Sequence, residues 1–334
     1  MNGSIADALS RLGPRLAGEG AVLEGLQRLS GGASMETWAF AFVGPKGRRD
    51  LILRRRPGGA AIPDEEDGRS NPLSVEAALI RAAVAGGVPA PPVAHVCTDE
   101  DGLGEAYVMG RVEGETLGRK IVGDPRFDAV RPKLARACGE ILARIHATPP
   151  PSGVVLRTAD ARAELDKYEE VYRRSGAQRP VFELAFRHLR ARAPKGRTPV
   201  LVHGDFRNGN LMIDPEKGII AVLDWELTHL GDPAEDLGWL CVNSWRFGKA
   251  DRPVGGFGDY ADLLAGYAAA GGEAIDLDRV LFWQALGSLK WGVMCLIMYM
   301  SILTSGDAGV ERAVIGRRVS ETEIDIIKIL ERGL

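Results

Sequence analysis

Residues 203–210 read HGDFRNGN, a stretch of the form H-x-D-x-x-x-x-N that follows a short apolar run. The apolar run predicts a strand, so Asp205 leaves the strand end into a loop and Asn210 stands just before the next expected strand. A further apolar run, residues 219–223, is followed directly by Asp224. We therefore expect three oxygen-bearing side chains, those of Asp205, Asn210 and Asp224, to converge on one spot.

Phosphoryl transfer requires such a set. A carboxylate orients the attacking hydroxyl and accepts its proton, while an amide oxygen and a second carboxylate hold Mg²⁺, a hard cation that prefers oxygen ligands. The spacing between Asp205 and Asn210 matches the catalytic-loop pattern of protein kinases. A polar hairpin with Asx turns is the alternative. His-Gly-Asp, the fixed spacing and a second Asp after an apolar run together favour a phosphotransferase.

Length and composition limit the class of protein. The chain has 334 residues, 45% of them hydrophobic and 26% charged, with a formal net charge of −3. This composition predicts a folded protein of about two domains, and the near-neutral charge argues against a nucleic-acid partner. Four separate cysteines without zinc spacing predict reduced thiols in a cytoplasmic protein, and residues 1–16 lack the apolar core of a signal peptide.

One segment has the length of a membrane span. Residues 281–303 are mostly apolar, but Gln284, Ser288 and Lys290 interrupt the first half. The remaining apolar run is too short to cross a bilayer. We therefore expect a buried helix of a large lobe and no membrane partner.

The chain is expected to form two lobes, an α+β architecture. Residues 1–109 predict a small β-rich lobe with one helix. Its strands are marked by the alternation at 38–42, where aromatic residues alternate with alanine, and its helix, residues 75–85, has Ser74 as the expected cap. Residues 110–334 predict a larger, mainly helical lobe, since apolar residues recur at helical spacing between 134 and 145. A two-lobed fold makes a cleft, where small molecules usually bind.

With these motifs the sequence resembles the aminoglycoside phosphotransferase and choline kinase superfamily, the small-molecule branch of the protein-kinase-like fold, from about Leu29 to the C-terminus. The resemblance implies that Asp205 is the catalytic base, that Asn210 and Asp224 are metal ligands, and that ATP and Mg²⁺ are the cofactors. Asp232 and Asp236 resemble a segment that braces the catalytic loop, although capping or solvated acids are equally expected there.

The same resemblance assigns nucleotide-binding residues to the small lobe. Ser30, Gly31, Gly32 and Ser34 stand where a glycine-rich phosphate loop is expected. Arg54 stands where the family has a lysine for the phosphates, with Arg55 or Arg56 as alternatives if the strand register differs. Glu76 is the expected partner of that cation, and an acid favoured by the helix dipole is the alternative.

Residues 107–114 resemble the hinge between lobes. Adenine would bond to backbone groups near Met109 and Arg111. His203 is expected to support the catalytic loop, since Asp205 already has the proton-accepting role.

The phosphate acceptor is less determined. No A-P-E segment is present and little room exists for an activation loop after Asp224, which favours a small-molecule hydroxyl over a protein. Acidic residues (Asp251, Asp259, Asp262 and Glu273) would suit an aminoglycoside, but such acids are usually solvated. Tryptophans (Trp239, Trp245, Trp283 and Trp291) suggest an aromatic pocket, with core packing as the alternative.

Residues 286–292 and 315–323 look like the phosphotransferase domain fused to acyl-CoA dehydrogenases. That resemblance implies a hydroxylated acyl-type substrate such as a hydroxyacyl-CoA. Lys290, Arg317 and Arg318 could bind such an anionic acceptor. Ion pairs on the helix surface are the alternative role for these three residues. A kinase for aminoglycoside or macrolide resistance and a non-catalytic, nucleotide-binding pseudokinase are the two alternatives.

Overall fold

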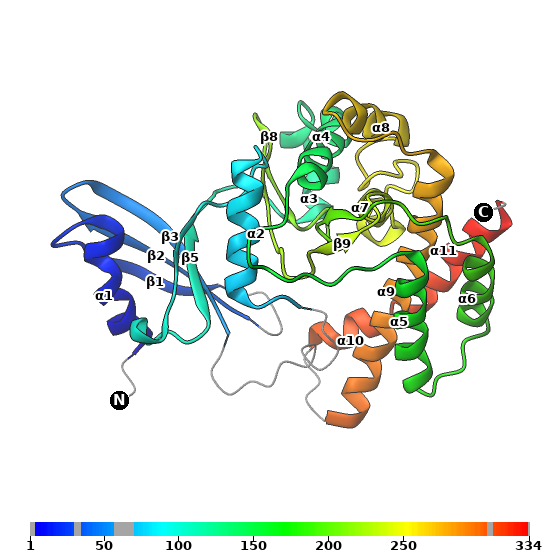
Figure 1. Ribbon diagram of the computed structural model, residues 1–334, viewed down its shortest axis with the longest axis horizontal. Coiled ribbons are helices and arrows are strands. Elements are labelled where there is room, and N and C mark those ends of the chain that lie inside the picture. Colours follow the sequence, from blue (N-terminus) through cyan, green and yellow to red (C-terminus); the bar gives the residue numbers. More distant parts are fainter. Residues whose placement is uncertain (1–3, 30–34, 57–69, 306–309, 333–334) are drawn as a thin grey trace. The chain divides into compact units, whose positions relative to one another are not determined.

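The computed structural model describes residues 4–29, 35–56, 70–305 and 310–332 (Figure 1). The chain divides into two compact units. The first unit comprises residues up to Gly114 together with 148–154 and 220–228, and the second comprises 115–147, 155–219 and 229 onward. The segment 220–228 therefore places Asp224 in the first unit, although it is distant in sequence from the rest of that unit.

In the first unit an antiparallel five-stranded sheet has the order β1-β2-β3-β5-β4. Gly47, with φ +96°, closes the β2–β3 hairpin, and the register pairs Phe40 with Leu51. The sheet and its two helices are β1 (Val22–Leu29), β2 (Glu36–Gly44), β3 (Gly47–Arg55), β4 (Val93–Val96), β5 (Ala106–Gly110), α1 (Ile5–Ala17) and α2 (Leu73–Ala85).

The first helix, α1, was not expected from the sequence, so the small lobe has two helices rather than one. Ser4 and Asp7 form a capping box at its start. Its buried apolar face joins Phe40 and Phe42 in one core cluster, and Figure 1 shows α1 lying against the sheet. The alternation at 38–42 is typical of a half-buried strand, but the alanine face of β2 is buried as well, so both faces of this strand are covered.

Helix α2 begins earlier than predicted. Its first residue is Leu73, and the N-cap is Pro72, without a side-chain cap hydrogen bond. Ser74 therefore lies inside the first turn, and its predicted role as the cap was wrong. The helix ends at Ala85, as predicted, with Gly86 as its C-cap, and the next residue, Gly87, has φ +80°.

The second unit is mainly helical, as predicted. Close packing of α4 on α8 uses two glycines, because a Cβ at Gly139 would lie 2.1 Å from the carbonyl oxygen of Leu263 and one at Gly266 would lie 2.0 Å from that of Arg136. Its helices are α3 (Gly118–Gly123), α4 (Leu134–Ala147), α5 (Ala161–Arg174), α6 (Pro180–Arg192), α7 (Ala234–Leu240), α8 (Tyr260–Ala269), α9 (Leu277–Ser305), α10 (Val310–Gly316) and α11 (Val319–Glu331).

Within the described residues, α9 is long and apolar enough to cross a membrane by length and composition alone. However, 83% of its most apolar window is buried inside the structure. It packs against α5, α6, α7, α10 and α11. The prediction of a buried core helix is confirmed.

Short strands position the catalytic loop. β6 (Val200–Val202) pairs antiparallel with β9 (His229–Gly231), and the HGDFRNGN loop leaves the end of β6. β7 (Leu211–Asp214) follows the loop, and β8 (Gly218–Val222) carries the chain from the second unit into the first. The assignment of residues 1–109 to nucleotide binding and of 110–334 to catalysis and acceptor binding stays a prediction.

Candidate active site

The Asp205 carboxylate lies in a fixed set of donors within the second unit. The indole N–H of Trp239 on α7 donates to Oδ1 at 2.7 Å. The Nε of Arg207 lies 3.1 and 3.2 Å from the two carboxylate oxygens. The Asn210 amide donates to Oδ2 at 2.6 Å and to the Asp205 main-chain carbonyl at 2.9 Å. These donors hold the carboxylate of Asp205 in one orientation. Its side chain is 15% exposed, so the carboxylate can still be reached from solvent.

Asn210 thereby satisfies a simple test for a cation ligand. Its amide nitrogen is used twice by Asp205, which leaves the amide oxygen to face other groups. An amide oxygen beside a carboxylate is a donor set that suits Mg²⁺. The pair predicted from the H-x-D-x-x-x-x-N spacing is therefore together in space.

The loop backbone is anchored from below by Asp236. Its two carboxylate oxygens accept the main-chain N–H groups of His203 at 2.8 Å and Gly204 at 2.9 Å, and His146 lies 3.1 Å from Oδ2. Burial alone would raise the pKa of Asp236, but the hydrogen bond and charge of His146 hold it below its ordinary value. The prediction that Asp236 braces the loop is confirmed.

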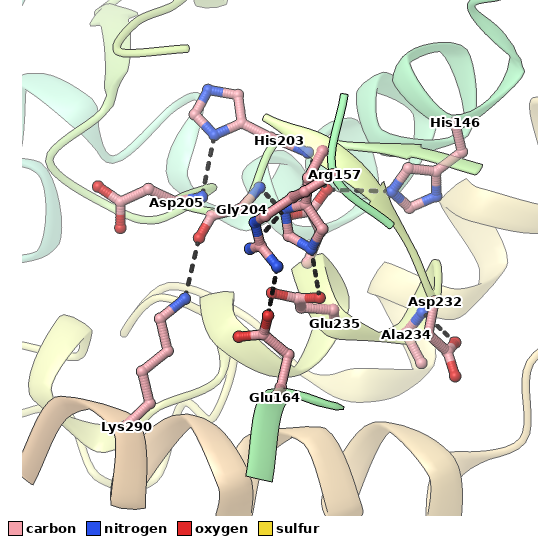
Figure 2. Close-up of polar contacts among 12 residues, drawn as sticks. His146, Arg157, Glu164, His203, Gly204, Asp205, Asp232, Ala234, Glu235 and Lys290 are labelled. Carbon is pink, nitrogen blue, oxygen red and sulfur yellow. Dashed lines mark hydrogen bonds and ion pairs between the residues drawn. The ribbon is translucent and has the colours of Figure 1, made fainter. Parts of the chain in front are cut away.

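Asp232 has a different role. Its carboxylate accepts the main-chain N–H of Ala234 and pairs with Arg279. It is thus a capping acid at the start of α7, the alternative considered from the sequence. Figure 2 shows Asp232 and Ala234 at one side of the network, away from Gly204 and Asp205.

Arg54 on β3 organises a group of acids within the first unit. Its Nη2 donates to Asp224 at 2.7 Å and to Glu226 at 3.1 Å, and its Nε lies 3.5 Å from Glu76 on α2. Glu76 is fully buried and accepts the hydroxyl of Tyr107 at 3.1 Å. Glu76 is therefore the ion-pair partner of Arg54, as predicted.

The electrostatics of this group follow from burial. Burial alone would lower the pKa of Arg54, but attraction to Glu76, Asp224 and Glu226 raises it well above its ordinary value, so the guanidinium is charged. Burial raises the pKa of Glu76, and Arg54 opposes that rise. Asp224 itself has φ +66°, a left-handed backbone conformation that is unusual for a residue with a side chain and is frequent at functional sites.

The neighbours of Arg54 make other pairs. Arg55 lies 3.3 Å from Glu36 and Arg56 lies 2.8 Å from Glu105. The register alternatives are therefore excluded as partners of Glu76 in the described structure.

Two further predictions concern the nucleotide. Met109 and Arg111 lie at the end of β5 and just after it, and the Arg111 N–H already donates to the Asp50 carbonyl at 3.1 Å. The predicted phosphate-loop residues Ser30, Gly31, Gly32 and Ser34 lie outside the described residues.

The acceptor predictions have mixed outcomes. Trp239, Trp245, Trp283 and Trp291 are all buried, so core packing describes them, although Trp239 also binds Asp205. The four acids considered for an aminoglycoside are exposed. Arg318 forms the expected helix-surface ion pair with Glu321.

Lys290 departs from both roles considered for it. It is 7% exposed, and its Nζ donates to the main-chain carbonyl of Gly204 at 3.3 Å. A surface ion pair is therefore wrong for this residue. The sequence offered no signal for the contact of Lys290 with the loop. It offered none for the hydrogen bond from Trp239 to Asp205 or for the ion pair between Arg54 and Glu226.

Solved structures that resemble this chain are kinase-like phosphotransferases. The fold is that of the kinase-like phosphotransferases, with 21% identity to a candidate aminoglycoside phosphotransferase from Ralstonia eutropha (TM-score 0.71, 98% of each chain). A choline/ethanolamine kinase family protein from Mesorhizobium loti is 22% identical (TM-score 0.62, 97% of each chain). A thermostable mutant of aminoglycoside phosphotransferase APH(4)-Ia, in complex with AMP-PNP and hygromycin B, is 15% identical (TM-score 0.62, 98% of each chain).

Residues 25–273 match the model of the phosphotransferase enzyme family, and the chain belongs to that family. Mouse acyl-CoA dehydrogenase family member 10 is 30% identical over 209 residues, which is 58% of this chain and 18% of that protein. The orangutan (Pongo abelii) family member 11 is 25% identical over 304 residues, 85% of this chain and 38% of that protein. The chain thus spans well under half the length of these relatives. The predicted family and fold class are confirmed.

Proposed function

We propose that the protein transfers the γ-phosphate of ATP to a hydroxyl group of a small molecule in a Mg²⁺-dependent reaction. The observation that carries this proposal is the Asp205 carboxylate, held by Trp239, Arg207 and Asn210 at the end of β6. Membership of a phosphotransferase family supplies the reaction class.

Asp205 is the proposed base. Its carboxylate would accept the acceptor's hydroxyl proton as the oxygen attacks the γ-phosphorus in line with the departing ADP oxygen. Three donors fix the carboxylate, and fixed orientation is the main protein contribution to phosphoryl transfer. Asn210, through its amide oxygen, and Asp224 would hold Mg²⁺, which when bound offsets charge on the phosphates.

Arg54 is proposed to contact the nucleotide phosphates. Its partner Glu76 is buried and orders the guanidinium, as a glutamate on the small-lobe helix orders the phosphate-binding lysine of protein kinases. The proposed nucleotide site is completed by backbone groups near Met109 and Arg111 and by the predicted phosphate-binding residues Ser30, Gly31, Gly32 and Ser34.

A hydroxyacyl-CoA is the proposed acceptor class. The support is the similarity to acyl-CoA dehydrogenase family members 10 and 11 over 58% and 85% of this chain. An aminoglycoside, as in the APH(4)-Ia complex with hygromycin B, or a macrolide is the alternative acceptor. The exposure of the four candidate acids weakens the aminoglycoside alternative.

The test compares the wild type with Asp205→Ala in an ATP-consumption screen against hydroxyacyl-CoAs, aminoglycosides, macrolides, choline and sugars. We expect one acceptor class to accelerate Mg²⁺-dependent consumption. With that acceptor, Asp205→Ala should lower kcat by about a thousandfold and leave nucleotide affinity within about twofold.

Glu170→Ala is the matched control, because this exposed acid on α5 is remote in sequence from the loop and has no proposed role in acceptor binding. Wild-type turnover in Asp205→Ala would remove the mechanism. Nucleotide binding without hydrolysis or transfer in the wild type would favour the non-catalytic pseudokinase.

A further inference from the structure

A buried lysine lies directly beneath the catalytic loop. Lys290 is on α9, and Figure 2 shows its side chain reaching from that helix to the carbonyl of Gly204, the residue before Asp205. The Nζ also lies 4.5 Å from the ring centroid of Trp239 and 5.8 Å from that of Tyr168. Both distances are within the range of a cation–π contact.

These contacts reach Asp205 by two routes. The first is the peptide group between Gly204 and Asp205: Lys290 binds its carbonyl at 3.3 Å, and its N–H donates to His203 Nδ1 at 3.2 Å. Both polar atoms of one peptide plane are thus held. The orientation of that plane fixes φ of Asp205 and hence the direction in which its side chain leaves the backbone.

The second route is Trp239. Its ring face receives the Lys290 ammonium, and its N–H donates to the Asp205 carboxylate at 2.7 Å. A cation over the ring increases the polarisation of the indole and strengthens its N–H as a donor. One ammonium therefore bears on both the backbone and the carboxylate of Asp205.

The nearby acids have other partners. Glu164 pairs with Arg157, as Figure 2 shows, and Glu235 lies 3.2 Å from His229. Burial alone would lower the pKa of Lys290, but Tyr168 and these acids raise it, so the side chain carries its charge. Among the described residues, the direct contacts of Nζ are the Gly204 carbonyl and the rings of Trp239 and Tyr168, so this charge is directed at the loop.

Lys290 cannot itself meet an acceptor in this arrangement. The cavity beside it, lined also by Glu164, Glu235 and Trp239, measures about 10 Å³. A space of that size holds at most one water.

We propose that Lys290 is a positioning residue for the catalytic base, acting on Asp205 through the Gly204 carbonyl and the Trp239 ring. The proposal rests on the proposed function of Asp205. It assigns to α9, which is distant from the HGDFRNGN motif in sequence, a role in the phosphoryl-transfer step and none in nucleotide binding.

The test uses Lys290→Met in the full chain, with Leu289→Ala as the matched control. Leu289 is the preceding residue on α9 and is fully buried, so its truncation reports loss of packing alone. With the acceptor found by the screen, or with slow Mg²⁺-dependent ATP hydrolysis, we expect Lys290→Met to lower kcat about ten- to a hundredfold and to leave KM for ATP within about twofold. Leu289→Ala should lower the melting temperature and leave kcat within about twofold.

A second readout needs no turnover. The indole ¹⁵N–H resonance of Trp239, assigned with Trp239→Phe, should shift in Lys290→Met and stay in place in Leu289→Ala. If Lys290→Met does not fold, Lys290→Gln removes the charge and keeps a donor for the Gly204 carbonyl, and it should move the same resonance and lower kcat by a smaller factor.

The outcomes separate the two proposals. A folded Lys290→Met enzyme with unchanged kcat, or with an unmoved Trp239 resonance, overturns the positioning role, as does an unmoved resonance in Lys290→Gln. A wild type with no ATP-dependent activity overturns the proposed function, and the resonance then still decides whether Lys290 acts on Trp239.

Discussion

Replacement of Arg54 by methionine should destabilise the first unit in a pH-dependent way. Methionine keeps much of the buried stem and removes the guanidinium that pairs with Glu76, Asp224 and Glu226. The variant therefore leaves Glu76, which is fully buried, without a cation beside it. Removal of one partner of a buried pair costs about 3–5 kcal/mol when the other remains charged.

The unpaired Glu76 can instead become protonated, so the cost cannot exceed the free energy of neutralising this carboxylate. The ordinary pKa of this group is 4.5. Neutralising it at pH 7 costs about 3.4 kcal/mol, and at pH 5 about 0.7 kcal/mol, because each pH unit above that value is worth about 1.4 kcal/mol. The pairs with Asp224 and Glu226 add less, about 0.2–1 kcal/mol each, since those acids are 31% and 27% exposed.

The sign of the pH dependence follows from the raised pKa of Glu76 in the folded protein. Between pH 4.5 and that raised value the folded state binds more protons than the unfolded state, so stability falls as pH rises. The contribution is fully present below pH 4.5 and is lost as pH rises through the folded pKa. Arg54 lowers the pKa of Glu76, so its removal raises that pKa further and extends this pH window upward. The variant should therefore lose more stability at pH 7 than at pH 5.

The assay is urea unfolding followed by circular dichroism at pH 5 and pH 7, with hydrogen exchange of β3 and α2 peptides to localise the effect. Arg54→Met combined with Glu76→Gln should regain most of the pH-dependent loss, because a neutral amide needs no counter-charge and can still accept the Tyr107 hydroxyl. Arg48→Met is the control on the same strand, since Arg48 is 52% exposed and should cost under about 1 kcal/mol. An equal loss at both pH values, unchanged by Glu76→Gln, would refute the reasoning.

Two further substitutions test the second unit. Asp236→Asn should lower kcat and cost about 1–3 kcal/mol at pH 7, because an amide cannot accept both the His203 and Gly204 N–H groups as the carboxylate does. The pKa of Asp236 is lowered from 3.8, so its contribution is present above that pH and fades as pH falls; the loss in urea unfolding should therefore be smaller at pH 3, and an equal loss would contradict this. Gly139→Ala should lower the melting temperature strongly, since the new Cβ would lie 2.1 Å from the backbone of Leu263. Gly123→Ala, with no atom within 4 Å, is the control, and equal melting temperatures would count against the close helix contact.

The sequence predicted the catalytic loop because its signal is local. The spacing of Asp205 and Asn210 brings the two side chains together across a single turn, at 2.6 Å. Strand alternation and helical apolar spacing are also set by near neighbours, so β2, α2, α4 and the buried α9 were predicted. The family resemblance added Arg54 and Glu76, which the structure brings within 3.5 Å.

Other elements gave weaker local signals. The first helix has its capping box in only four residues, Ser4 to Asp7, and was missed. Strands β1 and β4 were missed as well, because they are stabilised by pairing with β2 and β5, from which they are separated in the sequence. The alanine face of β2 is buried by tertiary packing, which an alternating pattern cannot report.

The amino-acid sequence by itself determined the chemical groups and the local elements that carry them, because backbone propensity and periodicity depend on residues within about one or two turns. Tertiary packing alone decided which distant group supports which loop. Lys290 lies 86 residues from Gly204 along the chain, and in the sequence it reads as a charge that interrupts an apolar helix. Its burial against a carbonyl and an indole ring arises only when α9 packs beneath the loop, since the ammonium must find partners where water is excluded.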